Sequence, residues 1–473
     1  MPVAYKWHPI TDLGDDPKSL TDGELESLKR VWANQKDEMI QLGTLDEFEK
    51  RLRREWAIET GIIEGVYTLD RGITRTLIEK GIESALIPHG ATNRDPELVG
   101  RIIQDHYDVL ETMFDLMGGQ RHLSTSYVKE LHAALLRNHE THTVEDQFGQ
   151  AFEKRLERGS YKTDPNSPTR PDGRVHEYCP PEHVASEMDE LLRMHTEHEA
   201  KAVPAEVEAA WLHHRFAQIH PFADGNGRVA RSIASLVFIK AGWFPLVVRR
   251  DDRARYIEAL ERADADDLRP LIAMFVEAQR NAVIQASEVA YDVRPVASTH
   301  DAIVAARDRL LQRGKLSPRE WLQAKHTAAN LHQSAMQRFQ RVAQELEQEI
   351  GSLGKGFVFG TGLAEPRAGA NAKAVYAAGQ TADFNEYSAA AQLSLNTGSN
   401  DAVMLSFHAL GPRFHGIIGV VAYLYLQHAE RILIKDGTFL INYEEDLATA
   451  QKRFSPWLER VIVEGLNEWR RTL

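Results

Sequence analysis

The stretch His220–Arg231, with the sequence HPFADGNGRVAR, joins two segments of helical periodicity. Pro204 opens the first helix, since proline is favoured at the first helical position, and Ile219 ends it. The second helix is expected to begin at Arg228, with Gly242 just past its end as the stop signal. A short polar loop between two helices is therefore the feature from which we predict the fold.

The glycines of this loop point to an anion site. Gly225 and Gly227 flank Asn226, and glycine permits positive φ and close approach of backbone to a ligand. The free N–H groups of a helix N-terminus, aided by the helix dipole, bind anions. Arg228 and Arg231 are three residues apart, so they project from one helix face, where their planar forks match phosphate oxygens.

Two further residues supply reactive groups. His220 ends the first helix, and its ordinary pKa near 6.5 suits proton abstraction at neutral pH. Asp224 lies at the mouth of the loop, where a hard cation could join it to phosphate oxygens. Taken singly, such a histidine is often a helix cap and such a loop only a turn. The joint spacing favours phosphoryl-type transfer, which needs a base, a metal carboxylate and a phosphate clamp.

The stretch resembles the signature of the Fic family, H-x-F-x-[DE]-G-N-G-R-x-x-R, at every defining position. The resemblance extends over about residues 100–285. It implies a mainly α fold, with a Fic-type helical core and a β-hairpin flap at about residues 160–179. Lys162 departs from the family pattern, because arginine is common at that position.

The resemblance also implies roles. His220 would deprotonate the target hydroxyl, Asp224 would hold Mg²⁺ on the phosphates of ATP, and Phe222 would anchor the loop in the core. An extended segment of a target protein would dock on the flap at residues 160–179 by strand addition. The residues expected to bind the phosphates of ATP are Gly225, Asn226, Gly227, Arg228 and Arg231.

A second motif lies earlier in the chain. Residues Thr60–Gly65, TGIIEG, resemble the inhibitory motif [S/T]-x-x-x-E-[G/N] of the family class in which an inhibitory helix precedes the domain. In that interpretation Glu64 reaches Arg231 as a bidentate pair and turns the α-phosphate of ATP away from attack. The alternative is a helix that simply ends at Gly65, with Glu64 in solvent.

Bulk composition excludes several other classes. The net charge of the 473 residues is −13, so a global basic field for nucleic acid is absent. The single cysteine, Cys179, cannot form an intramolecular disulfide and favours a reducing compartment. The longest apolar run, 416–426, is too short to cross a bilayer, and no signal peptide is evident. We therefore expect a cytoplasmic protein, although an effector exported without such a signal would look the same.

Three domains are expected from the length: an N-terminal helical region over 1–95, a catalytic domain over 96–290, and a C-terminal α+β domain over 300–473. Capping boxes at Thr21 and Thr44 predict helix starts in the first region, and the second of these helices would run to about Glu64. From Pro96 to Ala286 the pattern is helical, apart from a hairpin over 159–181 that the Asp172-Gly173 turn predicts.

The C-terminal domain follows an expected linker at 292–298. A long helix should start at Ser317-Pro318, and strands are expected beyond Gly351, with a hairpin turn at Asp436-Gly437. The closing 25 residues are expected to form a helix. We predict a target-recruiting or assembly role for this domain.

The function hypothesis is a protein adenylyltransferase that moves AMP from Mg-ATP to a hydroxyl side chain of a protein, held back by Glu64. A Fic-fold enzyme with another donor, such as UMP or phosphocholine transfer, or one that removes AMP, would reuse the same loop. A silent adaptor has no need of the intact base and arginines. The target and the oligomeric state stay open, a homodimer included.

Overall fold

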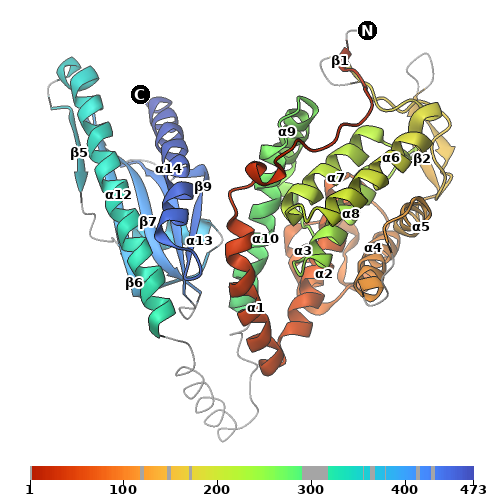
Figure 1. The fold of residues 1–473 in the computed structure, drawn as a ribbon, viewed down its shortest axis with the longest axis horizontal. Coiled ribbons are helices and arrows are strands. Elements are labelled where there is room, and N and C mark those ends of the chain that lie inside the picture. Colours follow the sequence, from red (N-terminus) through yellow and green to blue (C-terminus); the bar gives the residue numbers. More distant parts are fainter. Residues whose placement is uncertain are drawn as a thin grey trace, which may run out of the picture. The chain divides into compact units, whose positions relative to one another are not determined.

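The computed structural model describes residues 3–117, 122–145, 151–169, 173–289, 318–354, 356–362, 368–378, 380–411, 416–427 and 432–473. The chain divides into two compact units. The first unit comprises Met1–Leu25 with Gly43–Ala282, and the second comprises Glu26–Leu42 with Val283–Leu473. The fold is mainly α with an additional antiparallel sheet in the second unit, as the sequence predicts (Figure 1).

The first unit is a helical core. Its helices are α2 (Leu45–Ile63), α3 (Arg71–Lys80), α4 (Pro96–Met117), α5 (Thr125–Leu135), α6 (Pro181–Ala200), α7 (Ala205–Ile219), α8 (Asn226–Lys240), α9 (Arg253–Asp264) and α10 (Arg269–Val289), the last of which continues into the second unit. Helices α7 and α8 pack on each other, and α2, α4, α5, α6 and α9 each contact one of them (Figure 1). Every residue of α7 except Ala205 and Ala217 is buried. The two helices that flank the signature loop are thus the centre of this unit.

Helices α1 (Glu24–Leu42) and α2 begin close to the two predicted capping boxes, but the predicted caps do not form. At the start of α1, Asp22 and not Thr21 accepts the Glu24 N–H, at 3.0 Å. The Thr21 hydroxyl instead donates to Glu206 at 2.8 Å. Thr44 makes no side-chain cap hydrogen bond, because its backbone is already helical. At the start of α1, Asp22 has thus replaced Thr21 as the side chain that accepts the Glu24 N–H.

Hairpin geometry differs from the prediction. A regular antiparallel hairpin forms from β2 (Thr141–Glu145) and β3 (Ala151–Arg155), in a region where we expect only helix. The alternating β-branched residues of β2 are the signal that could have indicated it. In the described part of 159–181 the antiparallel pairing is one bridge, Thr169 with Val175, because prolines cannot donate to a ladder. Asp172 of the predicted turn lies outside the described residues.

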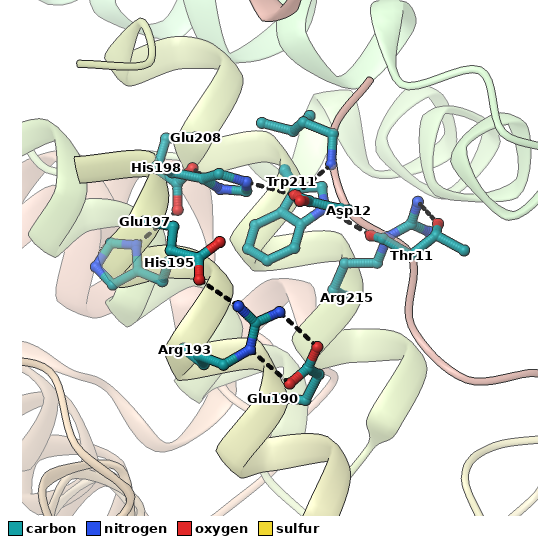
Figure 2. A network of polar contacts seen from close by, with 11 residues as sticks. Thr11, Asp12, Glu190, Arg193, His195, Glu197, His198, Glu208, Trp211 and Arg215 are labelled. Carbon is teal, nitrogen blue, oxygen red and sulfur yellow. Dashed lines mark hydrogen bonds and ion pairs between the residues drawn. The ribbon is translucent and has the colours of Figure 1, made fainter. Parts of the chain in front are cut away.

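The N-terminal segment is bound to this core. Strand β1 (Val3–Tyr5) pairs in parallel with β4 (Val175–His176), so it extends the flap region. Beyond it, the Thr11 carbonyl accepts the indole N–H of Trp211 at 3.0 Å, and the Arg215 guanidinium also donates to Thr11 (Figure 2). These contacts fix the chain against α7.

Asp12, which is itself exposed, contacts a polar cluster formed by the buried residues His195, His198 and Glu208. His198 bridges Asp12, at 2.6 Å, and Glu208, at 2.7 Å, and His195 contacts the other oxygen of Glu208 at 2.6 Å (Figure 2). Burial opposes the charged form of His198, but the two carboxylates outweigh it and raise its pKa. His195 and His198 of α6 are thus satisfied by hydrogen bonds.

The second unit is an antiparallel sheet with helices. Its elements are α1 (Glu24–Leu42), whose first two residues belong to the first unit, α12 (Pro318–Ile350), β5 (Val358–Gly362), α13 (Ala368–Ala377), β6 (Ala382–Asn396), β7 (Asn400–Leu410), β8 (Ile417–Tyr425), β9 (Ile432–Asn442) and α14 (Leu447–Arg470). The strand order is β5-β6-β7-β8-β9. Helices α12 and α14 cover one face of the sheet, while Val375 of α13 packs with Met404 and Tyr423 (Figure 1). The α+β prediction for this part of the chain is confirmed, and the expected linker at 292–298 lies outside the described residues.

The predicted hairpin turn at Asp436-Gly437 is wrong. Both residues lie inside β9, where the register against β8 shifts between Val421 and Tyr423. Asp436 has φ 54°, and a Cβ at Gly437 would come within 3.0 Å of the Ala422 carbonyl oxygen. An Asp-Gly pair suits positive φ in a bulge as well as in a turn. No described helix has the length and apolarity that a membrane span requires.

Candidate active site

His220 is the C-cap of α7, and its backbone has an unusual conformation. Its φ of 51° and ψ of 58° are left-handed, a region that non-glycine residues seldom occupy. The ring nitrogen Nδ1 lies 3.1 Å from the Ala217 carbonyl, so it carries the hydrogen and donates. This arrangement leaves the lone pair on Nε2 for a substrate.

The environment of the ring differs from the expectation of an ordinary pKa. Enclosure of the imidazole, and then the positive charge of Lys162, lower the pKa of His220 to about 3. Tyr178 stacks on the ring with centroids 3.7 Å apart and planes 5° apart. His220 is therefore neutral at physiological pH and able to accept a proton. The stacking partner Tyr178 has no distinguishing pattern in the sequence.

Asn226 and Phe222 fix the loop. The Asn226 side chain accepts the Phe222 N–H at 2.9 Å and donates to the Phe222 carbonyl at 2.7 Å. Phe222 is fully buried and stacks on His132 at 3.8 Å. The side chain of Asn226 is thus committed to the loop, and only its backbone could contact a phosphate. Helix α8 starts here, two residues before the predicted position.

Asp224 lies at the open side of the loop. Its Oδ1 accepts the Gly225 N–H at 2.6 Å, and its Oδ2 lies 3.4 Å from Nη2 of Arg228. Burial disfavours the charged form, but Arg228 and the Gly225 N–H outweigh it and hold the pKa of Asp224 below its ordinary value. His132 donates from Nε2 to the Asp224 carbonyl at 3.0 Å, a contact that no pattern in the sequence predicts. The side chain is 40% exposed and negatively charged.

The two arginines of the signature are buried and point to different partners. Arg228 approaches Asp224 and, at 3.4 Å, Nδ1 of His139, whose pKa burial lowers to about 4. Among the described residues, Nε of Arg228 has no hydrogen-bond partner. Such an orphaned donor beside an anion site is available for a phosphate oxygen. Arg231 is turned toward α2.

Glu64 is in contact with Arg231. Nη1 of Arg231 donates to Oε1 of Glu64 at 2.7 Å, while its Nε and Nη2 donate to the hydroxyl and carbonyl of Thr60 at 3.0 and 3.1 Å. The predicted partners thus meet, through one nitrogen instead of the predicted bidentate pair, because Thr60 takes the rest of the fork. A Cβ at Gly227 would collide with the Glu64 carboxylate, so this carboxylate lies directly at the N-terminus of α8.

A cavity of about 470 Å³ adjoins these groups. It is lined by Glu64, Tyr178, His220, Gly227, His213 and Tyr256, among others. The described residues hold no group of three or more His, Cys, Asp or Glu side chains placed to bind a metal. The lone carboxylate of Asp224 instead fits Mg²⁺, which commonly binds one or two carboxylates together with substrate phosphates.

Comparisons with known proteins find relatives of the part of the chain that contains this site. Residues 122–238 match the Fic/DOC family. A protein adenylyltransferase of Caenorhabditis briggsae is 26% identical over 230 residues, which is 47% of this chain and 40% of that relative. One from Nematostella vectensis is 44% identical over 64 residues, or 14% and 15% of the two chains.

A Fic-domain protein of Bacteroides thetaiotaomicron with a solved structure is 23% identical and covers 54% of this chain and 96% of its own, with a TM-score of 0.42. The chain spans less than half the length of the two adenylyltransferases it matches. Together with the signature loop, the family match shows a Fic/DOC-type domain over residues 122–238.

Proposed function

We propose that this protein is a protein adenylyltransferase, which transfers AMP from ATP to a hydroxyl side chain of another protein. The curated relatives carry that name. The observation that carries the proposal is a carboxylate, that of Glu64, held at the N-terminus of α8 beside a neutral histidine. A helix N-terminus that holds a carboxylate suits a phosphate equally well.

In the proposed reaction, Nε2 of His220 accepts the proton of the target hydroxyl. The hydroxyl oxygen attacks the α-phosphorus of ATP, the bond from that phosphorus to the bridging oxygen breaks, and pyrophosphate leaves. The backbone of Gly225 to Gly227 and the fork of Arg228 would bind the phosphates. With its hydrogen on Nδ1, His220 presents only one nitrogen to the substrate, which fixes the direction of proton transfer.

Asp224 is the residue that would hold Mg²⁺ beside the phosphates of ATP. The ion would neutralise charge on the phosphates. Asp224 suits this role because it stays ionised and partly exposed, while Arg228 keeps its carboxylate oriented.

Glu64 would act as an internal inhibitor. Its carboxylate occupies space at Gly227 and uses a nitrogen of Arg231 that a γ-phosphate would need. ATP bound beside it would be displaced from the in-line geometry that attack requires. Release needs only the end of α2 to move, since Thr60 and Glu64 both belong to its last turn.

The target would dock as an extended segment on the flap at residues 160–179. One edge of β4 already pairs with β1, so such a segment would pair with residues 160–169 or replace β1.

Incubation of the protein with ATP, with and without Mg²⁺, followed by mass spectrometry of modified proteins, tests the proposal. We expect Mg²⁺-dependent AMP on a serine, threonine or tyrosine, and none with His220→Ala. UTP and CDP-choline serve as alternative donors. Modification from either of them but not from ATP would replace the proposed donor, and loss of AMP from a premodified protein alone would replace the proposed direction.

A further inference from the structure

The flap holds the backbone of the signature loop on both sides of His220. The Lys162 N–H donates to the Pro221 carbonyl at 2.8 Å, and its ammonium lies 3.5 Å from the Ile219 carbonyl. These carbonyls belong to the residues directly before and after His220. A left-handed backbone persists only where the surroundings hold it, and Lys162 supplies two of the contacts that do so.

Asn166 extends the contact between flap and loop to Phe222. Its Oδ1 accepts the Lys162 ammonium at 2.7 Å, and its Nδ2 donates to the Phe222 carbonyl at 2.8 Å. Lys162 is 6% exposed, so its ammonium is oriented by these carbonyl oxygens and not by solvent. Burial lowers the pKa of Lys162 to about 8. The flap and the loop thus form one hydrogen-bonded body.

Tyr178 fixes the ring of His220 as the loop contacts fix its backbone. The Tyr178 ring lies parallel to the imidazole with centroids 3.7 Å apart, while the Ala217 carbonyl accepts the hydrogen bond from Nδ1. Together they leave the ring one orientation, with Nε2 as the free nitrogen. The Lys162 ammonium lies 5.9 Å from the centre of the other ring of this stack, that of Tyr178, within the range of a cation–π contact.

The segment after β4 that carries Tyr178 is itself restrained. The Glu177 N–H donates to the Tyr5 carbonyl of β1 at 3.0 Å, and the Tyr5 ring stacks on His176 with centroids 4.7 Å apart. The Tyr178 N–H donates to the Ser167 hydroxyl at 3.0 Å. Tyr178 therefore keeps its place through both neighbouring segments.

We propose that Lys162, Asn166 and Tyr178 are positioning residues of the flap, which set the backbone and the ring of His220 for proton abstraction. This inference rests on the proposed transfer reaction and adds a second role to the flap beside target docking. The charged and titratable groups that face His220 are Lys162 and His176 of the flap and Asp224 of the loop. Because one body holds both the docking segment and the base, a target that shifts the flap also shifts His220.

Variants of Tyr178 test the ring contact. Tyr178→Leu removes the stack, and Tyr178→Phe keeps it as the matched control. In the Glu64→Gly background, with AMP transfer from α-labelled ATP onto the chain itself as the assay, we expect Tyr178→Leu to lower kcat about 10- to 100-fold, the scale of a misplaced group. KM for ATP should stay within about twofold. Tyr178→Phe should retain the kcat of its background, and parental kcat in Tyr178→Leu would overturn the ring role.

Histidine-selective NMR gives a readout that needs no turnover, with the His220 signal assigned by its loss in His220→Asn. Tyr178→Leu should remove the ring-current shift of His220, and Tyr178→Phe should keep it. Lys162→Met should raise the pKa of His220, because Lys162 lowers it, whereas Lys162→Arg keeps the charge. An unmoved His220 signal in Tyr178→Leu, and an unmoved pKa in Lys162→Met, would overturn the inference. Absent transfer in every variant with these shifts present would instead contradict the proposed function.

Discussion

The properties of His220 depend more on its surroundings than on the imidazole itself. Its ordinary pKa suggests a base that titrates near neutrality, but enclosure and Lys162 lower that pKa to about 3. The neutral ring is a weaker base, yet it is always in the accepting form. In the proposed reaction, proton abstraction would then depend on the orientation of Nε2, which the Ala217 carbonyl and Tyr178 define.

Replacement of this group gives the first prediction. His220→Ala should lower AMP transfer by roughly 10²- to 10⁴-fold, the usual loss when a general base is removed. ATP binding and the melting temperature should change little, since the loop is held by Asn226 and Phe222. Transfer rates and calorimetric binding of ATP measure the two effects. A variant that melts as the parent does and transfers AMP at the parental rate would rule out the base role.

Asp224 gives a second prediction at this scale. Asp224→Ala should remove Mg²⁺-supported transfer more than it weakens nucleotide binding, because the glycines and arginines of the loop remain. A titration of the transfer rate with Mg²⁺ measures this, and Asp224→Asn is the matched control of similar size. Ordinary Mg²⁺ dependence in Asp224→Ala would assign the metal to another residue.

At the scale of elements, Arg231 links the end of α2 to the first turns of α8. Thr60 and Glu64, four residues apart on α2, bond to one guanidinium, that of Arg231, which is 1% exposed. An arginine this deeply buried requires partners. In the proposed inhibition, the Glu64 carboxylate alone would obstruct the site, whereas Thr60 would keep hydrogen bonds to Arg231 if Glu64 moved away.

Removal of that carboxylate is the third prediction. Glu64→Gly should raise AMP transfer of the chain onto itself above the parental level, and the double variant Glu64→Gly, Arg231→Ala should lose the gain. Glu55→Gly is the matched control. Glu55 also belongs to α2, but its carboxylate forms a 2.7 Å ion pair with Arg249 and does not contact α8. Unchanged or lower transfer in Glu64→Gly, with intact ATP binding, would mean that the TGIIEG stretch is only a helix end.

Local patterns predicted some elements well and others poorly. Short motifs with fixed spacing predicted the helices on either side of HPFADGNGRVAR. The TGIIEG motif likewise predicted that Glu64 approaches Arg231. The stack of Tyr178 on His220 could not be predicted, because it joins residues 42 apart through tertiary packing. The Asp436-Gly437 bulge was mistaken for a turn because both need positive φ at the same residue types.

At the scale of the whole molecule, the first unit contains several buried neutral histidines. They are His106, His132, His139, His213 and His220. Burial lowers the pKa of all five, to about 3 for His106 and His220 and to about 4 for His132 and His139. Unfolding lets such a group take a proton once the pH is below about 6.5. The unfolded state then binds more protons, so stability falls as the pH falls below that value.

The fourth prediction follows from this sign. The melting temperature of the first unit should decrease from pH 7 to pH 5, with each such histidine contributing about 1.4 kcal/mol per pH unit below 6. His106→Asn retains a donor for the Ala57 carbonyl, which His106 contacts at 3.0 Å, but cannot titrate. Calorimetry at several pH values should therefore give a shallower decrease for this variant. The raised pKa of His198 acts in the opposite direction. An equal slope in parent and variant would exclude His106 as a contributor.

The central claim is that AMP, and no other part of the nucleotide, passes to a protein hydroxyl. The most direct measurement compares ATP labelled at the α-phosphorus with ATP labelled at the γ-phosphorus, using Glu64→Gly with and without His220→Ala. We predict that protein retains the α label but not the γ label, and that His220→Ala abolishes retention. Retention of the γ label, or α labelling that persists without His220, would contradict the account.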